Sequence, residues 1–154
     1  PDPCYDLPIF GADLVVNSNN ISAGIVDLSP VGKHLPDSLI SQMRSLKVSK
    51  FTEPGELPEW GFIFSPYVAF IRPVDFLEEK SFLELIDQYL SLLLSLLVKV
   101  QRDEINSLDA MCRLNYQKRY CLNQKRNDKT RGILTKFFGS SWADEYINKI
   151  LFEC

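Results

Sequence analysis

LPIFGADLVVNSNNISAGIVDL, residues 7–28, is the stretch of sequence that decides the fold. Residues 7–16 and 21–28 are rich in side chains that favour β-strands, and the NSNN between them is rich in residues that form turns. The stretch therefore predicts a β-hairpin with residues 17–20 as its loop.

Antiparallel pairing around this loop determines which side chains share a face of the hairpin. In the expected register Val16 pairs with Ile21, and Asp13 lies opposite Gly24. One face is then wholly apolar, with Phe10, Ala12, Leu14, Val16, Ile21, Ala23 and Ile25. The other face holds one carboxylate among small and branched residues, with Gly11, Asp13, Val15, Ser22, Gly24 and Val26. We therefore expect a flat ligand to approach the backbone beside Asp13, where the glycines carry no side chain.

Asp13 is the most informative residue of this hairpin, because a carboxylate in an apolar strand is costly unless it is paired or functional. Removal from water favours the protonated form of a carboxylate, and a proton donor near neutral pH requires that form. The alternative is a structural carboxylate that is hydrogen-bonded at a strand bulge or to a loop. The residues alone leave both interpretations open.

The middle of the chain predicts two helices separated by irregular structure. A helix is expected over 36–46. The stretch 78–100 contains no Gly or Pro, so one long helix is expected there, apolar enough to lie deep in the structure. Between them, 53–61 is interrupted by Pro and Gly and predicts an ordered loop, whereas 63–64 and 67–72 resume strand character.

Three further helices are expected in the last third of the chain. The first covers about 103–126, Asp128 caps the second, and Ser141 with Asp144 resembles a capping box for a third that ends near Phe152. Strands followed by helices predict an α+β fold with an antiparallel sheet.

Composition points to one globular domain, 1–154, because 45% of the 154 residues are hydrophobic and 24% are charged. The opening Pro-Asp-Pro is typical of the interior of a longer protein. The four cysteines form no C-x-x-C pair and the single histidine, His34, has no metal-ligand spacing to them, so we expect a reducing compartment and no metal site. The longest apolar run, 89–98, is too short for a membrane span.

Basic residues gather in 113–136, where eight of them against one acid give a local charge of +7 in a chain of net charge −3. Such a surface suits an acidic partner, although a stretch of this kind is more often a solvated helical face, and its few aromatic residues do not favour nucleic-acid binding. NDKTR at 127–131 adds an amide, a carboxylate and two cations at a helix start. That position favours an anionic ligand, and a plain N-cap is the alternative.

Five separate blocks of the sequence resemble, in order and spacing, the ferredoxin-dependent bilin reductases. They are 5–15 (YDLPIFGADLV), 21–30 (ISAGIVDLSP), 56–61 (ELPEWG), 127–131 (NDKTR) and 142–152. The resemblance covers nearly the whole chain. It implies an α/β/α sandwich, in which a central antiparallel sheet flanked by helices binds a U-shaped tetrapyrrole between the sheet and the C-terminal helices.

The resemblance also implies a reaction, the reduction of biliverdin IXα to a phycobilin, with phycocyanobilin favoured over phycoerythrobilin. Electrons would arrive singly from reduced [2Fe-2S] ferredoxin and pass through bilin radicals, and the protein itself would bind no cofactor and no metal. The implied partner is an acidic ferredoxin docked on the basic C-terminal helices of a monomer, in the cytoplasm or the plastid stroma of a cyanobacterium-like source.

Residue roles follow from the same resemblance. Asp13 matches a strand aspartate that protonates the bilin, and Asp128 matches a second aspartate used in proton transfer or substrate positioning. The expected substrate-binding residues are Ser22, Gly24, Asn127 and Lys129. Of these, Lys129 is the expected partner of a propionate.

The chain also departs from the family pattern. Gly55 stands where other members have an arginine that holds a propionate. The family's catalytic histidine and glutamate lie upstream of Tyr5, and His34 does not align with that histidine, so the chain is expected to be the C-terminal portion of a reductase domain. The alternative function is a non-catalytic bilin-binding or basic-helix interaction module, in which fixed partners satisfy Asp13 and leave no cavity beside it.

Overall fold

The chain folds into a small sheet with helices on both of its faces. The computed structural model describes residues 1–17 and 20–153. In chain order the elements are β1 (Ile9–Asn17), β2 (Asn20–Ser29), α1 (Asp37–Ser45), a 3₁₀ helix (Glu59–Ile63), β3 (Ala69–Ile71), α2 (Phe76–Leu97), α3 (Leu108–Gln124), α4 (Asp128–Phe138), α5 (Ser140–Tyr146) and a closing π-helical turn (Ile147–Leu151). The expected α+β class is confirmed.

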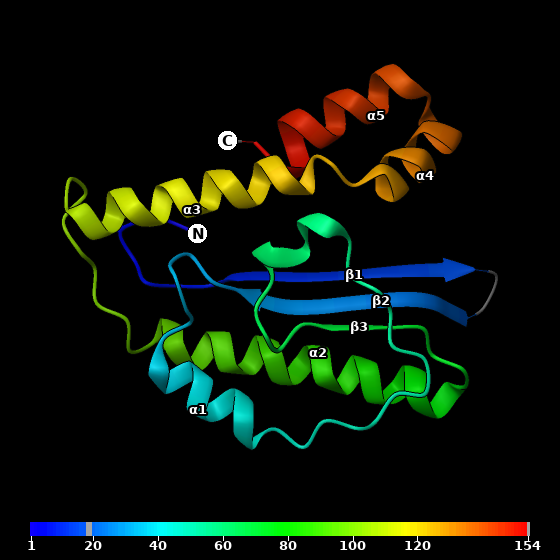
Figure 1. Ribbon diagram of the computed structural model, residues 1–154, viewed down its shortest axis with the longest axis horizontal. Helices are drawn as coiled ribbons and strands as arrows, with labels where there is room; N and C mark the ends of the chain where they lie inside the picture. The colour runs from blue at the N-terminus through cyan, green and yellow to red at the C-terminus, as the bar shows by residue number, and fades with distance from the viewer. Residues whose placement is uncertain (18–19, 154) are drawn as a thin grey trace.

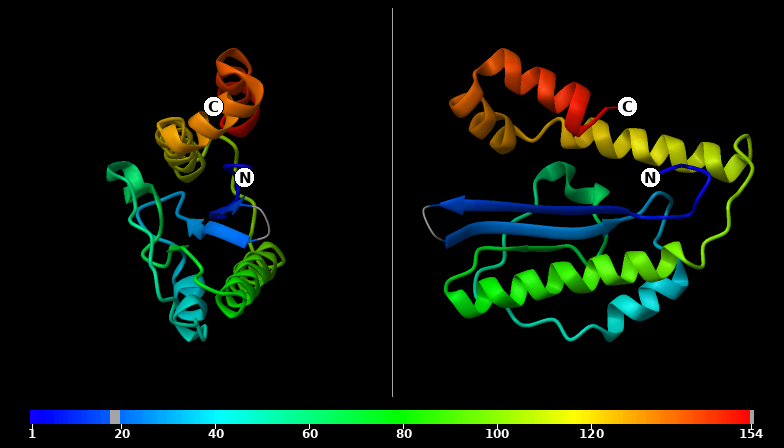
Figure 2. Two further views of the ribbon diagram at one scale, coloured as in Figure 1. Left: turned by 90° about the vertical axis from the view of Figure 1, so that its right-hand side faces the viewer. Right: turned by 180° about the vertical axis from the view of Figure 1, so that it is seen from behind.

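The helices form two layers with the sheet between them. Figure 1 shows α1 and α2 on one side of the sheet and α3, α4 and α5 on the other, and the end-on view in Figure 2 agrees. The strands run antiparallel in the order β1-β2-β3. This arrangement is the α/β/α sandwich that the sequence predicts.

The hairpin forms where the sequence predicts it. β1 and β2 lie within one or two residues of the expected strands, and Val16 pairs with Ile21 as expected. Two residues of the expected loop, Ser18 and Asn19, lie outside the described residues.

Beyond that first pair the register differs from the prediction by one residue. Asp13 lies opposite Ile25, not opposite Gly24. The cause is a bulge beside Val15 that leaves Ser22 as an extra residue in β2, and the Ser22 hydroxyl donates to the Val15 carbonyl at 2.9 Å. Because side chains alternate along a strand, this slip exchanges the two faces of β2 relative to β1.

The face of the hairpin that carries Asp13 therefore differs from the expected one. It combines Gly11, Asp13 and Val15 with Ala23, Ile25 and Asp27. The opposite face combines Phe10, Ala12 and Leu14 with Gly24, Val26 and Leu28. The expectation of Asp13 beside Gly24 on one face was wrong, because it assumed a hairpin without a bulge.

The hydrophobic core lies between the sheet and the layer formed by α1 and α2. Its buried members are Val26, Leu28, Leu35, Leu39, Met43, Ile71, Phe82, Leu85 and Tyr89. Phe82 of α2 packs where Gly24 has no side chain, since a Cβ at Gly24 would come within 2.3 Å of the ring. The Tyr89 hydroxyl donates to the carbonyl of Tyr67 at 2.5 Å and ties α2 to the loop before β3.

The long helix was expected to lie deep in the structure, and this expectation was wrong. α2 buries only Phe82, Leu85 and Tyr89, on the side that faces the sheet. Its other side leaves apolar residues exposed, and Leu94 retains 53% of its accessible surface. The absence of Gly and Pro correctly indicated a helix, but an apolar composition does not say how many sides of it are covered.

Several element boundaries also differ from the sequence prediction. The strand expected over 67–72 is reduced to β3, and the residues expected to form a strand at 63–64 end the 3₁₀ helix and follow it. Asn127, not Asp128, caps α4, because its side chain accepts from the backbone N–H of Thr130 at 3.2 Å. Ser141 makes no capping box, because α5 begins one residue earlier and has no side-chain cap.

Replacing Gly24 by alanine is expected to destabilise the fold by about 1–3 kcal/mol, because the added methyl group must displace the buried ring of Phe82. Urea denaturation would measure the loss. The matched control is Gly132→Ala in α4, where a Cβ meets nothing within 4 Å, and it is expected to gain about 0.5–1 kcal/mol from helix propensity. Equal stability of Gly24→Ala and the parent would contradict the close contact.

Candidate functional site

A large cavity lies between the sheet and the helical layer formed by α3 and α4. Its volume is about 1610 Å³, and we call it the main cavity. Its floor includes residues of both hairpin strands, and its opposite wall includes residues of α3 and of the start of α4. It exceeds the ordinary range of small-ligand pockets, roughly 300–1,000 Å³, so it has room for a large, extended molecule.

Five of the six residues predicted to carry function line this one cavity, and four of them have charged or polar side chains. Asp13 comes from β1, and Asn127, Asp128 and Lys129 come from the start of α4, far away in the sequence. The fold therefore brings together the two aspartates that the sequence selected separately. Asp13 is exposed, so the expectation that its strand would bury it was wrong for this chain.

The two remaining predicted residues take different positions. Gly24 lines the main cavity, but a side chain there would point into the ring of Phe82 on the other side of the sheet. Ser22 is not among the lining residues, and its hydroxyl donates to the carbonyl of Val15 at the bulge. Substrate binding by these two residues remains a prediction.

Gly11 allows α3 to approach the floor of the main cavity. A Cβ at Gly11 would lie 3.3 Å from the Tyr120 hydroxyl oxygen, so that hydroxyl lies directly over the strand. The side-chain amide of Gln124 donates to the same hydroxyl at 2.9 Å. Burial raises the pKa of Tyr120, so the phenol stays protonated at neutral pH.

Asp27 is a functional candidate that the sequence prediction missed. It is 1% exposed, lies on the cavity side of β2 opposite Gly11, and belongs to the lining of the main cavity. One carboxylate oxygen accepts from the Ser29 hydroxyl at 2.6 Å and from the Ser65 N–H at 2.9 Å, and the other accepts from the Ser65 hydroxyl at 2.5 Å. Burial raises the pKa of Asp27, and these hydrogen bonds oppose that rise.

The cations of the basic segment 113–136 do not form one uniform surface. Four of them line the main cavity: Lys118, Arg126, Lys129 and Lys136. Arg72, which directly follows β3, lines it as well. Arg131 pairs with Asp144 of α5. A large part of the local charge is therefore directed at whatever occupies the main cavity, where it favours anionic groups.

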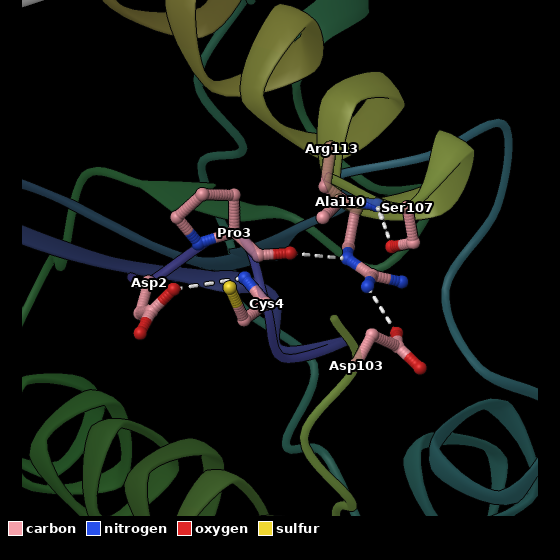
Figure 3. Close-up of polar contacts among 7 residues, drawn as sticks. All are labelled: Asp2, Pro3, Cys4, Asp103, Ser107, Ala110 and Arg113. Atoms are coloured by element: carbon pink, nitrogen blue, oxygen red, sulfur yellow. Dashed lines mark hydrogen bonds and ion pairs between the residues drawn. The ribbon is translucent and has the colours of Figure 1, made fainter. Parts of the chain in front are cut away.

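Arg113 is a structural member of the same segment. It is buried, pairs with Asp103 and donates through Nε to the carbonyl of Pro3 at 2.7 Å, as Figure 3 shows. In the same region the backbone N–H of Asp103 donates to the carbonyl of Cys4 at 2.8 Å. These contacts fasten the start of α3 to the first residues of the chain and so fix the wall of the main cavity.

Residues 1–17 and 20–153 lack two other kinds of feature. No group of three or more His, Cys, Asp or Glu side chains in this range is arranged to hold a metal ion. No helix in the same range is long and apolar enough to cross a membrane.

Comparison with known proteins identifies relatives of this chain. Residues 1–153 match the family model described as ferredoxin-dependent bilin reductase. The chain is 51% identical over 153 residues to phycocyanobilin:ferredoxin oxidoreductase of Prochlorococcus marinus (strain MIT 9313). This match covers 99% of this chain and 58% of that protein. It is 46% identical over 154 residues to the protein of the same name from Synechococcus sp. (strain CC9605), with 99% and 62% covered.

A solved structure has the same fold. It is a selenomethionine form of phytochromobilin synthase from tomato in complex with biliverdin, with a TM-score of 0.79 at 22% identity, and the match covers 99% of this chain and 57% of that one. The chain thus spans 58% and 62% of the length of the two relatives described above.

Proposed function

Because this chain belongs to the ferredoxin-dependent bilin reductase family, we propose that it takes part in the reduction of biliverdin IXα to a phycobilin, with phycocyanobilin as the product. The names of the relatives at 46–51% identity support that product. Electrons come one at a time from the [2Fe-2S] cluster of reduced ferredoxin, so each step oxidises one ferredoxin and reduces the bilin by one electron.

The main cavity is the observation that carries this proposal. A bilin is a long, flat tetrapyrrole with two propionates, and the cavity of about 1610 Å³ offers a strand floor with small residues at Gly11 and Ala23. Carboxylates and cations line the same space, which suits a ligand that has both pyrrole nitrogens and propionates. The bilin therefore lies between the hairpin and α3.

Proton supply is assigned to Asp13 and Asp128. Each electron added to the bilin is balanced by one proton, and a general acid has to lie within hydrogen-bonding reach of the atom it protonates. Asp13 rises from the floor of the main cavity and Asp128 lies at its opposite wall, so the two carboxylates reach the substrate from different sides. Asn127 accepts from the backbone of Thr130, which holds its amide at the start of α4 beside Asp128.

The propionates are assigned to the cations that line the main cavity. Position 55 has no room for a side chain in place of the family arginine. The N–H of Gly55 donates to the Phe70 carbonyl at 2.7 Å, and a Cβ there would lie 2.5 Å from the Phe70 ring. Arg72 and Lys129 line the cavity from its two sides, so they can supply the charge that an arginine at 55 supplies elsewhere in the family. Ser22 and Gly24 retain their proposed place near the substrate.

The remaining parts of the proposal concern the setting of the reaction. The protein carries no redox cofactor of its own and acts as a monomer in the cytoplasm or the plastid stroma. An acidic ferredoxin docks on the basic surface of the C-terminal helices, where the positive segment 113–136 lies.

An absorbance titration with biliverdin IXα tests whether the main cavity is the binding site. We expect saturable binding to the 154-residue chain with a change in the bilin spectrum, and weaker binding after Ala23→Trp, which fills the floor of the cavity. The control is Ala143→Ser in α5, outside the lining, which is expected to leave binding unchanged. Equal affinity of the parent and Ala23→Trp would refute this placement.

Replacing Lys129 by glutamine is expected to weaken biliverdin binding about five-fold, because an exposed charge–propionate pair is worth about 1 kcal/mol. The same titration gives the dissociation constant. The matched control is Lys99→Gln, an exposed lysine outside the main cavity, which is expected to leave the constant unchanged. If Lys129→Gln and Lys99→Gln change the dissociation constant for biliverdin by the same small factor, Lys129 does not contact the substrate.

A further inference from the structure

A second cavity of about 690 Å³ lies on the other side of α3 from the main cavity, and we call it the second cavity. Tyr116 and Arg119 of α3 line it, whereas Gln117 and Lys118 line the main cavity. We propose that the second cavity is where the acidic ferredoxin docks to deliver its electron. This proposal rests on the proposed function and places its protein partner at one edge of the basic segment 113–136, which contributes Arg119 to the second cavity.

The charge of the second cavity has one sign. It is lined by Lys33 and His34 of the loop after β2, by Arg44 of α1 and by Arg119 of α3. None of the described residues that line it is an Asp or a Glu. The main cavity has a mixed lining instead, in which five acidic side chains stand beside five cations: Asp13, Asp27, Glu56, Asp128 and Glu153. Charge complementarity therefore favours the second cavity for a protein with a negative surface.

Two cations of the second cavity, Arg119 and Arg44, are held in place by aromatic neighbours. The Arg119 guanidinium carbon lies 4.7 Å from the centre of the Phe62 ring, a cation–π contact. Nε of Arg44 donates to the Tyr67 hydroxyl at 3.2 Å. Side chains held in this way lose little conformational entropy when a partner docks, which favours association.

The wall between the two cavities gives the docked protein access to the substrate. Phe64 and Tyr120 belong to the lining of both cavities, so one layer of side chains separates them. A cluster held over the second cavity therefore gives up one electron across this layer, and the bilin in the main cavity gains it. The cluster is oxidised by one electron, the bilin is reduced by one electron, and a protonated carboxyl group of the main cavity supplies the proton and is left as a carboxylate.

A triple substitution tests the docking site. Lys33→Gln, Arg44→Gln and Arg119→Gln together remove three positive charges from the second cavity. The control triple, Lys47→Gln, Lys50→Gln and Lys99→Gln, removes the same charge from exposed positions that line neither cavity. At low salt we expect the first triple to weaken binding of ferredoxin about ten-fold, since electrostatic attraction is lost, and the control to change it less than about two-fold.

Three measurements separate docking from the rest of the proposed function. Calorimetry with ferredoxin gives the docking affinity without turnover, and a biliverdin titration is expected to give the same affinity in all three proteins. A small one-electron dye that needs no docking site is expected to reduce bound biliverdin equally fast in all three. The parent protein could reduce no biliverdin with either ferredoxin or the dye, while the first triple still binds ferredoxin more weakly than the parent does. In that case the proposed reduction fails and the docking site stands.

Three results would overturn the docking site. The first is equal weakening of ferredoxin binding by both triples, and the second is no ferredoxin binding by the parent. The third is loss of inorganic pyrophosphate binding in the first triple with unchanged ferredoxin affinity, which would make the second cavity a site for a small anion.

Discussion

Replacing Asp13 by asparagine is expected to leave biliverdin bound and to slow its reduction by about 10²–10⁴-fold, which is the usual contribution of a positioned general acid. Asparagine keeps the shape of the side chain and cannot donate the proton that balances an added electron. The bilin should therefore stall as a radical after electron transfer. Absorbance recorded during single-turnover reduction under anaerobic conditions measures the rate and shows the radical.

The matched control for this prediction is Asp87→Asn in α2. Asp87 is an exposed carboxylate on a helix that covers the other face of the sheet, so its replacement removes the same charge without touching the main cavity. We expect parent-like reduction from it. Parent-like reduction by Asp13→Asn as well would remove Asp13 from the mechanism, whereas loss of biliverdin binding would give it a binding role.

Replacing Asp27 by alanine is expected to lower the free energy of unfolding by about 3 kcal/mol. The change removes the acceptor of the buried Ser65 N–H and of two hydroxyls, and an unsatisfied buried donor costs about 1–3 kcal/mol. Urea denaturation at pH 7 measures the loss. Asp87→Ala is the control and should stay within about 0.5 kcal/mol of the parent, as exposed substitutions do. A loss of that small size from Asp27→Ala would show that the network contributes little.

The pH dependence of stability tests the same carboxyl group in a second way, by comparison of the parent protein with Asp27→Asn. Burial raises the pKa of Asp27 above its ordinary value of 3.8, so the folded state holds this proton more tightly than the unfolded state does. The protonated Asp27 therefore stabilises the folded state fully at a pH below its pKa in the unfolded chain. This stabilisation is lost as the pH rises through its pKa in the folded protein. Asparagine has no such proton, so the stability advantage of the parent over Asp27→Asn should shrink from pH 4 upward. A constant difference across pH 4–8 would contradict the raised pKa.

Much of the fold follows from local sequence signals. The alternating strands around NSNN predicted the hairpin, and the absence of Gly and Pro predicted α2. The register was mispredicted because a bulge at Ser22 has no distinct signal in the run of small residues Ser22 to Gly24. Exposure of one side of α2 depends on what packs against it, and no local pattern specifies that.

The candidate site was predicted only in part, because local sequence signals reveal some of its residues and tertiary packing determines the others. Asp13 stood out as a carboxylate in an apolar strand and Asp128 through the family resemblance, and the fold places both in one cavity. Asp27 was missed although it is also a carboxylate in an apolar strand, because its buried hydrogen bonds depend on Ser65, which lies 38 residues further along the chain. Tyr120 was missed because its position over Gly11 depends on how α3 packs, which no spacing along the chain reveals.

The most direct test is anaerobic addition of reduced ferredoxin to the 154-residue chain loaded with biliverdin IXα, followed by absorbance. Bound biliverdin is expected to pass through a radical and give a blue-shifted phycobilin product, with an amount of oxidised ferredoxin that matches the electrons gained by the bilin. Bound biliverdin whose spectrum stays unchanged while ferredoxin remains reduced would contradict the proposed function.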